Sequence, residues 1–431
     1  MVAQGDLVKV FYKEKIIEGL LMPEDNSEFT FLKMSSGYNI GLKTSSVKKI
    51  ELLKKKFSLP KKNEIIVLKK DLPTISILHT GGTIASKVDY STGAVIAKFS
   101  ESDILKLFPE IELFANIKSH LVRNMQSEMI RFAHYNLLAK AVEKEIKAGA
   151  QGIILTHGTD TLHYTAAALS FALENINVPV ILVGSQRSSD RGSTDAAVNL
   201  IAAMQFIVNS DFAGVAICMH ENFNDENCLI LPACKSRKMH TSRRDAFRPI
   251  NTSPIARVNH EKKQIVFLSD YNKKVNYNGL KLSLKLFNDK LKIGLLKAHV
   301  NMFASEFLAY KDFDGLVIEL LGIGHLPTMK VDEFTSENDK LLKAVRELVK
   351  NMPVVVAPQT IYGKIDMNVY SPGRQLIQSG LIGNYTDMTP ETAFIKLAWL
   401  LSNHKKDVKE LFSKNLRGEI SDRSEKEGFL I

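Results

Sequence analysis

Cysteine is scarce in this chain, with 3 cysteines among 431 residues. Secreted domains that depend on disulfides carry many more, so this composition excludes a disulfide scaffold and favours a reducing compartment. No apolar run reaches the roughly 18 residues that suggest a membrane-spanning helix, and the first residues do not have the pattern of a signal peptide. We therefore expect a cytoplasmic protein that does not enter a membrane.

Cofactor motifs are missing as well. Segment 322–325, Gly-Ile-Gly-His, does not complete a dinucleotide fingerprint, and the chain has no P-loop, so we expect no nucleotide cofactor on it. Segment 218–240 is rich in sulfur and imidazole, but the spacing matches no standard zinc pattern, and we predict no metal site. The residues concerned are Cys218, His220, Cys228, Cys234 and His240.

What the chain does have is a strong alternation of apolar runs and helix-like segments. Its length and its 45% hydrophobic content suffice for more than one core. The alternation predicts an α/β fold with parallel sheets and flanking helices. Strands are expected at 75–79, 152–155, 179–184, 212–219, 292–296, 315–320 and 353–357, and helices at 162–173, 194–208 and 336–350.

The first 53 residues differ from the rest, because their short alternating runs are typical of a small SH3-like β-barrel. Such barrels bind peptides, RNA or other domains, and some only pack on the main body. Ten lysines against three acidic residues follow in segment 43–71. This basic stretch could contact RNA phosphates, or it could be a linker that its lysines keep in water.

These patterns divide the chain into five parts. They are a small β-barrel domain (1–55), a basic linker (56–73), a larger α/β domain (74–275), a smaller C-terminal α/β domain (290–405) and a charged tail (406–431).

Two predicted strands of the larger domain end in hydroxyl-bearing loops. Segment 80–86, Thr-Gly-Gly-Thr-Ile-Ala-Ser, follows the first strand, and segment 156–161, Thr-His-Gly-Thr-Asp-Thr, follows the next. Ligands bind at the carboxyl ends of strands in open α/β sheets, and adjacent glycines allow close approach of a ligand to the backbone. The alternative is that the first segment is an ordinary turn and that the second only caps a helix.

Together the two loops resemble the bacterial-type L-asparaginase and glutaminase family of amidohydrolases, over residues 73 to 405. The resemblance places the family's catalytic threonines at Thr83 and Thr159 and its aspartate at Asp160. Counting back from segment 245–247, Asp-Ala-Phe, it places the catalytic lysine at Lys238. The family fold is a larger and a smaller α/β domain, and each active site is completed by a neighbouring protomer.

The resemblance also implies substrate-binding residues. The serine of the first binding loop corresponds to Ser127, and the tyrosine of the mobile lid corresponds best to Tyr90. Glu128 stands where a free asparaginase commonly has a neutral residue. This charge leaves the choice between glutamine and asparagine open.

The chemistry requires these residue types in its own right. A threonine hydroxyl is a weak nucleophile near neutral pH and needs a base, which Lys238 could supply if Asp160 orients it. We expect the hydroxyl to attack the side-chain amide, backbone N–H groups to stabilise the oxyanion, and water to hydrolyse the acyl-enzyme after ammonia leaves. Either Thr83 or Thr159 could attack first.

The segments outside the amidohydrolase body resemble those of the glutaminase subunits of archaeal tRNA-dependent amidotransferases. That resemblance implies a chain that releases ammonia from glutamine for a partner protein, GatE, which amidates Glu-tRNA(Gln) and would carry ATP and Mg. It also implies a homodimer within a heterotetramer. Two alternatives remain open: a standalone cytosolic L-asparaginase, and an RNA-binding module whose amidohydrolase body is inactive. The second predicts loss of a catalytic residue, yet all four are present.

Overall fold

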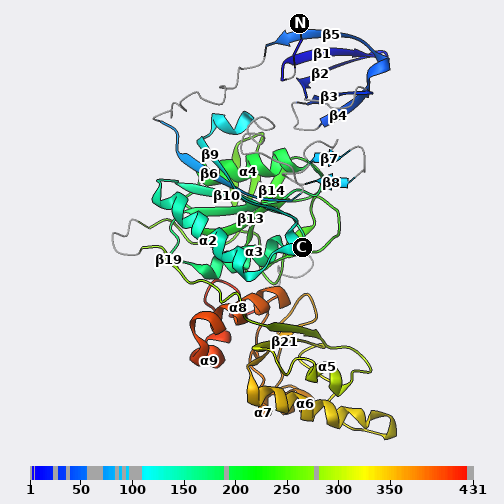
Figure 1. Cartoon of the computed structure of the whole chain (residues 1–431), viewed down its shortest axis with the longest axis vertical. Helices are drawn as coiled ribbons and strands as arrows, with labels where there is room; N and C mark the ends of the chain where they lie inside the picture. Colours follow the sequence, from blue (N-terminus) through cyan, green and yellow to red (C-terminus); the bar gives the residue numbers. More distant parts are fainter. Residues whose placement is uncertain are drawn as a thin grey trace.

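The computed structural model of the chain describes residues 2–3, 5–22, 28–34, 39–55, 71–82, 87–89, 94–96, 109–188, 194–275 and 281–424. The N-terminal part is a five-stranded antiparallel sheet with the strand order β4-β3-β2-β1-β5 (Figure 1). Its strands are β1 (Leu7–Tyr12), β2 (Lys15–Leu21), β3 (Phe29–Lys33), β4 (Asn39–Lys43) and β5 (Val47–Lys54). Val8, Val10, Leu32 and Leu42 form its small core, which is consistent with the predicted barrel-like domain.

The larger domain is built on an eight-stranded sheet with the order β18-β17-β14-β13-β12-β10-β6-β9. Five neighbouring strands are parallel: β9 (Asn116–Met125), β6 (Thr74–Gly81), β10 (Gly152–Thr156), β12 (Pro179–Val183) and β13 (Gly214–His220). The other three are antiparallel: β14 (Asn227–Pro232), β17 (Ala256–Asn259) and β18 (Gln264–Phe267). The expected parallel strands are present, and the sheet as a whole is mixed because the last strands are joined without crossover helices.

Helices cover both faces of this sheet. Alternate residues of β10 show why, since Ile153 and Leu155 enter the core with α2 (Phe132–Lys147) and α3 (Leu162–Ala172), whereas Ile154 enters the core with α4 (Ala196–Val208). A strand that is buried on both faces must be apolar throughout. The continuous apolar runs in the sequence predict this arrangement.

The smaller domain has a parallel three-stranded sheet in the order β20-β21-β22. Its elements are β20 (Ile293–Lys297), α5 (Ala304–Leu308), β21 (Gly315–Leu320), α6 (Glu337–Asn351), β22 (Val354–Pro358), α7 (Ser371–Gln378), α8 (Pro390–Asn403) and α9 (Val408–Phe412). Helix α8 lies where the two α/β domains meet (Figure 1). Its apolar residues share one core with α3, β21 and β22, so it ties the two domains together.

Short strand pairs complete the fold. They are β7 (Lys87–Asp89) with β8 (Ala94–Ile96), β11 (Leu173–Glu174) with β19 (Ser283–Leu284), and β15 (Ser236–Lys238) with β16 (Phe247–Pro249). Among the described residues, no helix has the length and apolar character needed to cross a membrane.

The last part of the chain, expected to be a charged tail, folds back on the body as far as residue 424. Glu419 is fully buried and pairs with the equally buried Lys396 of α8 at 2.6 Å. Arg417 donates a hydrogen bond to the carbonyl oxygen of Ser170, at the end of α3. The charges of Arg417 and Glu419 therefore serve internal contacts.

Candidate active site

The two hydroxyl-bearing loops meet at one edge of the large sheet. Strands β6 and β10 are parallel neighbours with His79 opposite Thr156, so both loops leave the carboxyl edge side by side. Gly82 of the first loop has a φ of +78°, and a Cβ atom placed there would lie 2.3 Å from the backbone nitrogen of Gly158. Only glycine allows the two loops to approach this closely.

Thr159 and Asp160 of the second loop both contact Lys238. The Lys238 Nζ donates a hydrogen bond to Thr159 Oγ1 over 2.8 Å and another to Asp160 Oδ1 over 2.7 Å. The Lys238 side chain is 12% exposed and that of Asp160 is 65% exposed, so the carboxylate lies at the open side of the cluster. An amine in contact with a hydroxyl and held by a carboxylate is the arrangement that moves a proton from a nucleophile.

Lys238 reaches this cluster from a hairpin. It lies in β15 and pairs with Phe247 in β16. In the connecting loop the buried carboxylate of Asp245 accepts hydrogen bonds from Arg243 over 2.8 Å and from Arg248 over 2.7 Å. The hydrogen bond from Arg243 lowers the pKa of Asp245, so its carboxylate is ionised and holds the loop through charged hydrogen bonds.

A buried histidine supports the second loop from beneath. His157 Nδ1 lies 2.6 Å from the carbonyl oxygen of Gly158, and its Nε2 lies 2.8 Å from Thr165 Oγ1 in α3. Burial lowers the pKa of His157 to about 4, so the ring is neutral at pH 7. One nitrogen can then donate while the other accepts, which fits one carbonyl and one hydroxyl partner.

Ser127 packs against the second loop. It is buried at the start of the 3₁₀ turn Ser127–Met129, and a Cβ atom placed on Gly158 would lie 2.7 Å from its Oγ. Thr161 Oγ1 donates a hydrogen bond to the carbonyl oxygen of Ser127 over 2.7 Å. Glu128 follows on the exposed side of this turn. The structure therefore brings Ser127, Thr159, Asp160 and Lys238 to one edge of the sheet.

Two predicted site residues, Thr83 and Tyr90, lie outside the described residues. Gly82, which directly precedes Thr83, is described and contacts the second loop through Gly158. The role of Thr83 as a nucleophile and that of Tyr90 as a lid residue stay predictions.

Sequence reasoning missed a charged cluster behind Lys238. Arg237 Nε lies 3.0 Å from Glu391 Oε1, at the start of α8. His163 Nε2 lies 4.0 Å from the same oxygen. Burial, together with the charges of Arg237 and Lys238, lowers the pKa of His163 to about 3. Only the position of His163, three residues after Asp160, hinted that it lies near the site.

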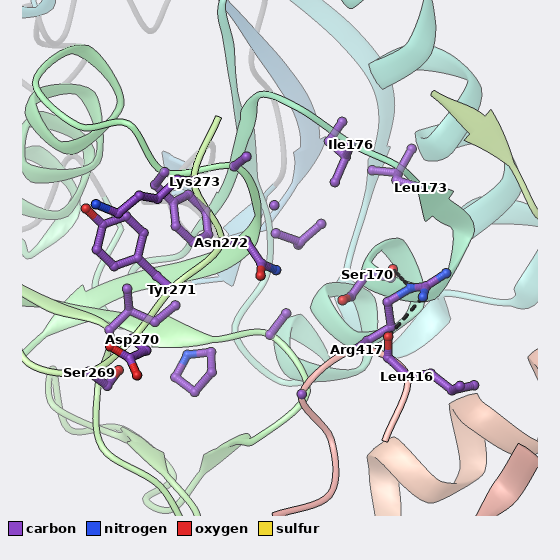
Figure 2. Close-up of a pocket in the computed structure, with 18 of the residues that line it drawn as sticks. Ser170, Leu173, Ile176, Ser269, Asp270, Tyr271, Asn272, Lys273, Leu416 and Arg417 are labelled. Carbon is purple, nitrogen blue, oxygen red and sulfur yellow. Dashed lines mark hydrogen bonds between the residues drawn. The ribbon is translucent and has the colours of Figure 1, made fainter. Parts of the chain in front are cut away.

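A separate cavity of about 630 Å³ lies at the opposite end of the sheet (Figure 2). Its lining includes Ser170 at the end of α3, Gly214 at the start of β13, and Arg417. Thr159, Asp160 and Lys238 do not line it. Because reacting groups of open α/β sheets gather at the carboxyl ends of strands, the loop cluster is the better candidate for chemistry.

Comparison with known proteins agrees with the three-part fold. Residues 74–272 match the family model "Asparaginase, N-terminal", residues 292–412 match "Glutaminase/Asparaginase C-terminal domain", and residues 2–53 match "GatD N-terminal domain". The GatD subunit of glutamyl-tRNA(Gln) amidotransferase from Methanococcus maripaludis is 40% identical, over 97% of this chain and 98% of its own length. That of Thermococcus kodakarensis is 40% identical, over 99% and 96%.

The chain belongs to the GatD family of glutamyl-tRNA(Gln) amidotransferase subunits. Solved structures similar to this member of the family include asparaginases. The thermostable L-asparaginase from Thermococcus kodakarensis has a TM-score of 0.69 and 28% identity, and the match covers 81% of this chain and all of that protein. L-asparaginase I from Vibrio cholerae has a TM-score of 0.68 and 25% identity, covering 81% and 99%. The family resemblance drawn from the two loops is confirmed.

Proposed function

We propose that this chain is the glutaminase subunit of a tRNA-dependent amidotransferase. The observation that carries the proposal is the contact of Lys238 with both Thr159 and Asp160, in a chain whose residues 2–53 match the amino-terminal domain of the GatD family. The first feature supports amide hydrolysis. The match of residues 2–53 supports a role of this hydrolysis as one half-reaction of a larger enzyme.

The geometry supports a specific division of labour. In its neutral form the Lys238 amine accepts the proton of the Thr159 hydroxyl and becomes an ammonium group, and Asp160 holds that amine against the hydroxyl. The activated threonine then attacks the side-chain amide of glutamine, ammonia leaves with a proton from the relay, and water releases glutamate from the acyl-enzyme. Thr83, adjacent to the loop contact at Gly82, is the second hydroxyl of this mechanism. Either threonine can form the acyl bond in this scheme.

A standalone L-asparaginase would use the same site residues, and the similar solved structures bear that name. Those structures nevertheless cover about 81% of this chain, whereas the GatD relatives cover at least 97%. The extra part includes the five-stranded N-terminal sheet. Hydrolysis of a free amino acid does not require such a domain, which favours the amidotransferase.

The amidation half of such an enzyme needs ATP and Mg to activate a glutamyl carboxylate. This chain has no phosphate-binding motif. We therefore assign ATP and Mg to the partner protein GatE, which would bind Glu-tRNA(Gln) and receive the ammonia. Since aminoacyl-tRNA is made and used in the cytoplasm, we place the complex there.

Apolar side chains at the edge of the smaller domain support self-association. Val300 and Phe303 follow β20 and are 86% and 50% exposed, and Val331 and Phe334 follow β21 and are 75% and 86% exposed. Exposed apolar side chains that gather on one surface mark protein–protein interaction sites. We propose a homodimer through this edge, within a heterotetramer that includes two copies of GatE.

The direct test is ammonia release from glutamine and from asparagine, measured for the chain alone and with GatE and Glu-tRNA(Gln). We expect glutamine to be preferred and its hydrolysis to rise when the charged tRNA is bound, a coupling between distinct sites. High asparaginase activity of the isolated chain, without any effect of partner or tRNA, would favour the standalone enzyme.

A further inference from the structure

The strand that carries Lys238 is held from its opposite face. Successive side chains of a strand point to opposite sides, so Arg237 points away from the side on which Lys238 meets Thr159. Arg237 Nε lies 3.0 Å from Glu391 Oε1. The Arg237 side chain is 28% exposed and that of Glu391 is 10% exposed, so water screens this ion pair only in part.

Glu391 is well placed to act as an anchor. It lies in the first turn of α8, which begins with Pro390 and is capped by Thr389. An acidic side chain is stabilised at a helix amino end. Because α8 packs in the core shared by the two α/β domains, its first turn is a rigid part of the molecule.

His163 of α3 lies close to both Glu391 and the hairpin that carries Lys238. Its Nε2 lies 4.0 Å from Glu391 Oε1, and its ring meets the Phe247 ring edge-on with centroids 6.2 Å apart. Phe247 is the residue that pairs with Lys238 across the hairpin. Helix α3 therefore packs directly against the hairpin through His163 and Phe247.

A second ion pair holds the same segment two residues earlier in the chain. Lys235, which directly precedes β15, lies 2.6 Å from Asp387, and both side chains are almost fully buried. Lys235 Nζ also donates to Ser421 Oγ over 2.5 Å, and Asp387 accepts from the backbone nitrogen of Ser421 over 3.0 Å. Asp387 lies just ahead of α8, so both anchors join the hairpin to the same short region.

We propose that Arg237 and Glu391 are positioning residues for the amide hydrolysis, which fix the hairpin so that Lys238 reaches the Thr159 hydroxyl. The Lys235–Asp387–Ser421 contact sets the start of the same strand. This inference rests on the proposed function. It goes beyond that function by adding an anchor, contributed by α8, that touches neither substrate nor reacting atoms.

The expected effect is large because proton transfer depends steeply on geometry. A displacement of about 1 Å in a reacting group can cost roughly a hundredfold in rate. Glu391→Gln keeps the shape of the side chain and removes its charge. We expect it to lower kcat for glutamine by about ten- to a hundredfold, with KM little changed, because the lost contact positions a catalytic group and not the substrate.

The test is steady-state glutamine hydrolysis by the full chain in complex with GatE. Arg237→Met should reproduce the loss, and Arg237→Met combined with Glu391→Gln should lose little more than either change alone. Glu337→Gln, which breaks the exposed Lys340 pair in α6, is the matched control and should leave kcat unchanged. A kcat for Glu391→Gln within about twofold of wild type would overturn the proposal, since positioning losses are larger.

The kinetic assay and a crystal structure together separate this inference from the proposed function. If the wild-type complex hydrolyses glutamine and the Glu391 and Arg237 variants match it, the inference alone fails. If the wild-type complex does not hydrolyse glutamine, the proposed function fails, and a crystal structure of Glu391→Gln still tests the anchor. That structure should show Lys238 Nζ displaced from its 2.8 Å contact with Thr159, and an unchanged contact would refute the anchor.

Discussion

Lys238 donates a hydrogen bond to Thr159 Oγ1 over 2.8 Å, although 79 positions separate the two residues. The contact exists because the β15–β16 hairpin folds over the carboxyl edge of the large sheet, where the loop after β10 presents its hydroxyl. Asp160 adds a carboxylate to the same amine at 2.7 Å. The base therefore comes from one segment, and the hydroxyl and the orienting carboxylate come from another. The first loop approaches the second where Gly82 meets Gly158.

Gly82→Ala should abolish the activity while leaving most of the fold intact. The new Cβ would lie 2.3 Å from the nitrogen of Gly158, so the two active-site loops would have to separate. Gly149→Ala is the control, because Gly149 also has a positive φ (+90°) but no atom within 4 Å of the added Cβ. We expect the control to cost only about 1–2 kcal/mol in unfolding free energy. Equal activities of the two variants would refute the loop contact.

Glu128→Gln tests whether this exposed carboxylate contributes to substrate binding. If Glu128 attracts the ammonium group of glutamine, its neutralisation raises KM and leaves kcat unchanged. An exposed pair is worth at most about 1 kcal/mol, which corresponds to an increase of up to about fivefold. The effect should shrink at high salt. Unchanged KM values for both glutamine and asparagine would remove Glu128 from the binding site.

Acid should destabilise the folded chain between pH 6.5 and pH 4. Burial lowers the pKa of His79 to about 4, that of His157 to about 4 and that of His163 to about 3, each from 6.5. The unfolded chain therefore binds protons in this range that the folded chain does not, so the free energy of unfolding falls as pH falls. His79→Asn should make the decrease shallower. Denaturant unfolding at several pH values measures this decrease. A free energy of unfolding that does not change with pH would contradict the assignment of neutral buried histidines.

Lys396→Met should destabilise the chain strongly. It would leave Glu419 fully buried without its cation, which costs about 3–5 kcal/mol in comparable cases. Adding Glu419→Leu to Lys396→Met should recover part of the loss, because the unpaired charge is then gone. Lys340→Met breaks an exposed pair and should cost under about 1 kcal/mol. Denaturant midpoints compare the three variants, and equal effects of Lys396→Met and Lys340→Met would mean that residues 416–422 do not pack as described.

Much of the fold could be predicted because its central strands are apolar throughout. The predicted strand 315–320 coincides with β21, and the predicted helix 336–350 differs from α6 by one residue at each end. The antiparallel edge of the large sheet could not be predicted, since the interior of β14 is as apolar as the parallel strands and β17 is only four residues long. Strand direction follows from connections and packing that composition does not reveal.

The site could be predicted only in part, for a similar reason. Thr159, Asp160 and Ser127 stand in loops that directly follow strands or precede helices, and such positions are visible in the sequence. Arg237, in contrast, gains its role from Glu391, which lies more than 150 positions away. The same holds for the pairing of Lys396 with Glu419, which turns an apparently charged tail into part of the core. Pairing between distant side chains requires the three-dimensional structure.

In the proposed enzyme, Thr159 and Lys238 release the ammonia that GatE uses on Glu-tRNA(Gln). The most direct measurement is Gln-tRNA(Gln) formation by the complex of this chain with GatE, with glutamine or with ammonium chloride as nitrogen source. With glutamine, Thr159→Val and Lys238→Met should each lower the rate of Gln-tRNA(Gln) formation by at least about a hundredfold, as expected for nucleophile and proton-transfer roles. With ammonium chloride, both variants should form Gln-tRNA(Gln) at a near wild-type rate. Lys414→Met, which removes an exposed cation near the end of α9, should keep the wild-type rate with either nitrogen source. Full glutamine-dependent formation of Gln-tRNA(Gln) by Lys238→Met would refute the role of Lys238 in ammonia release.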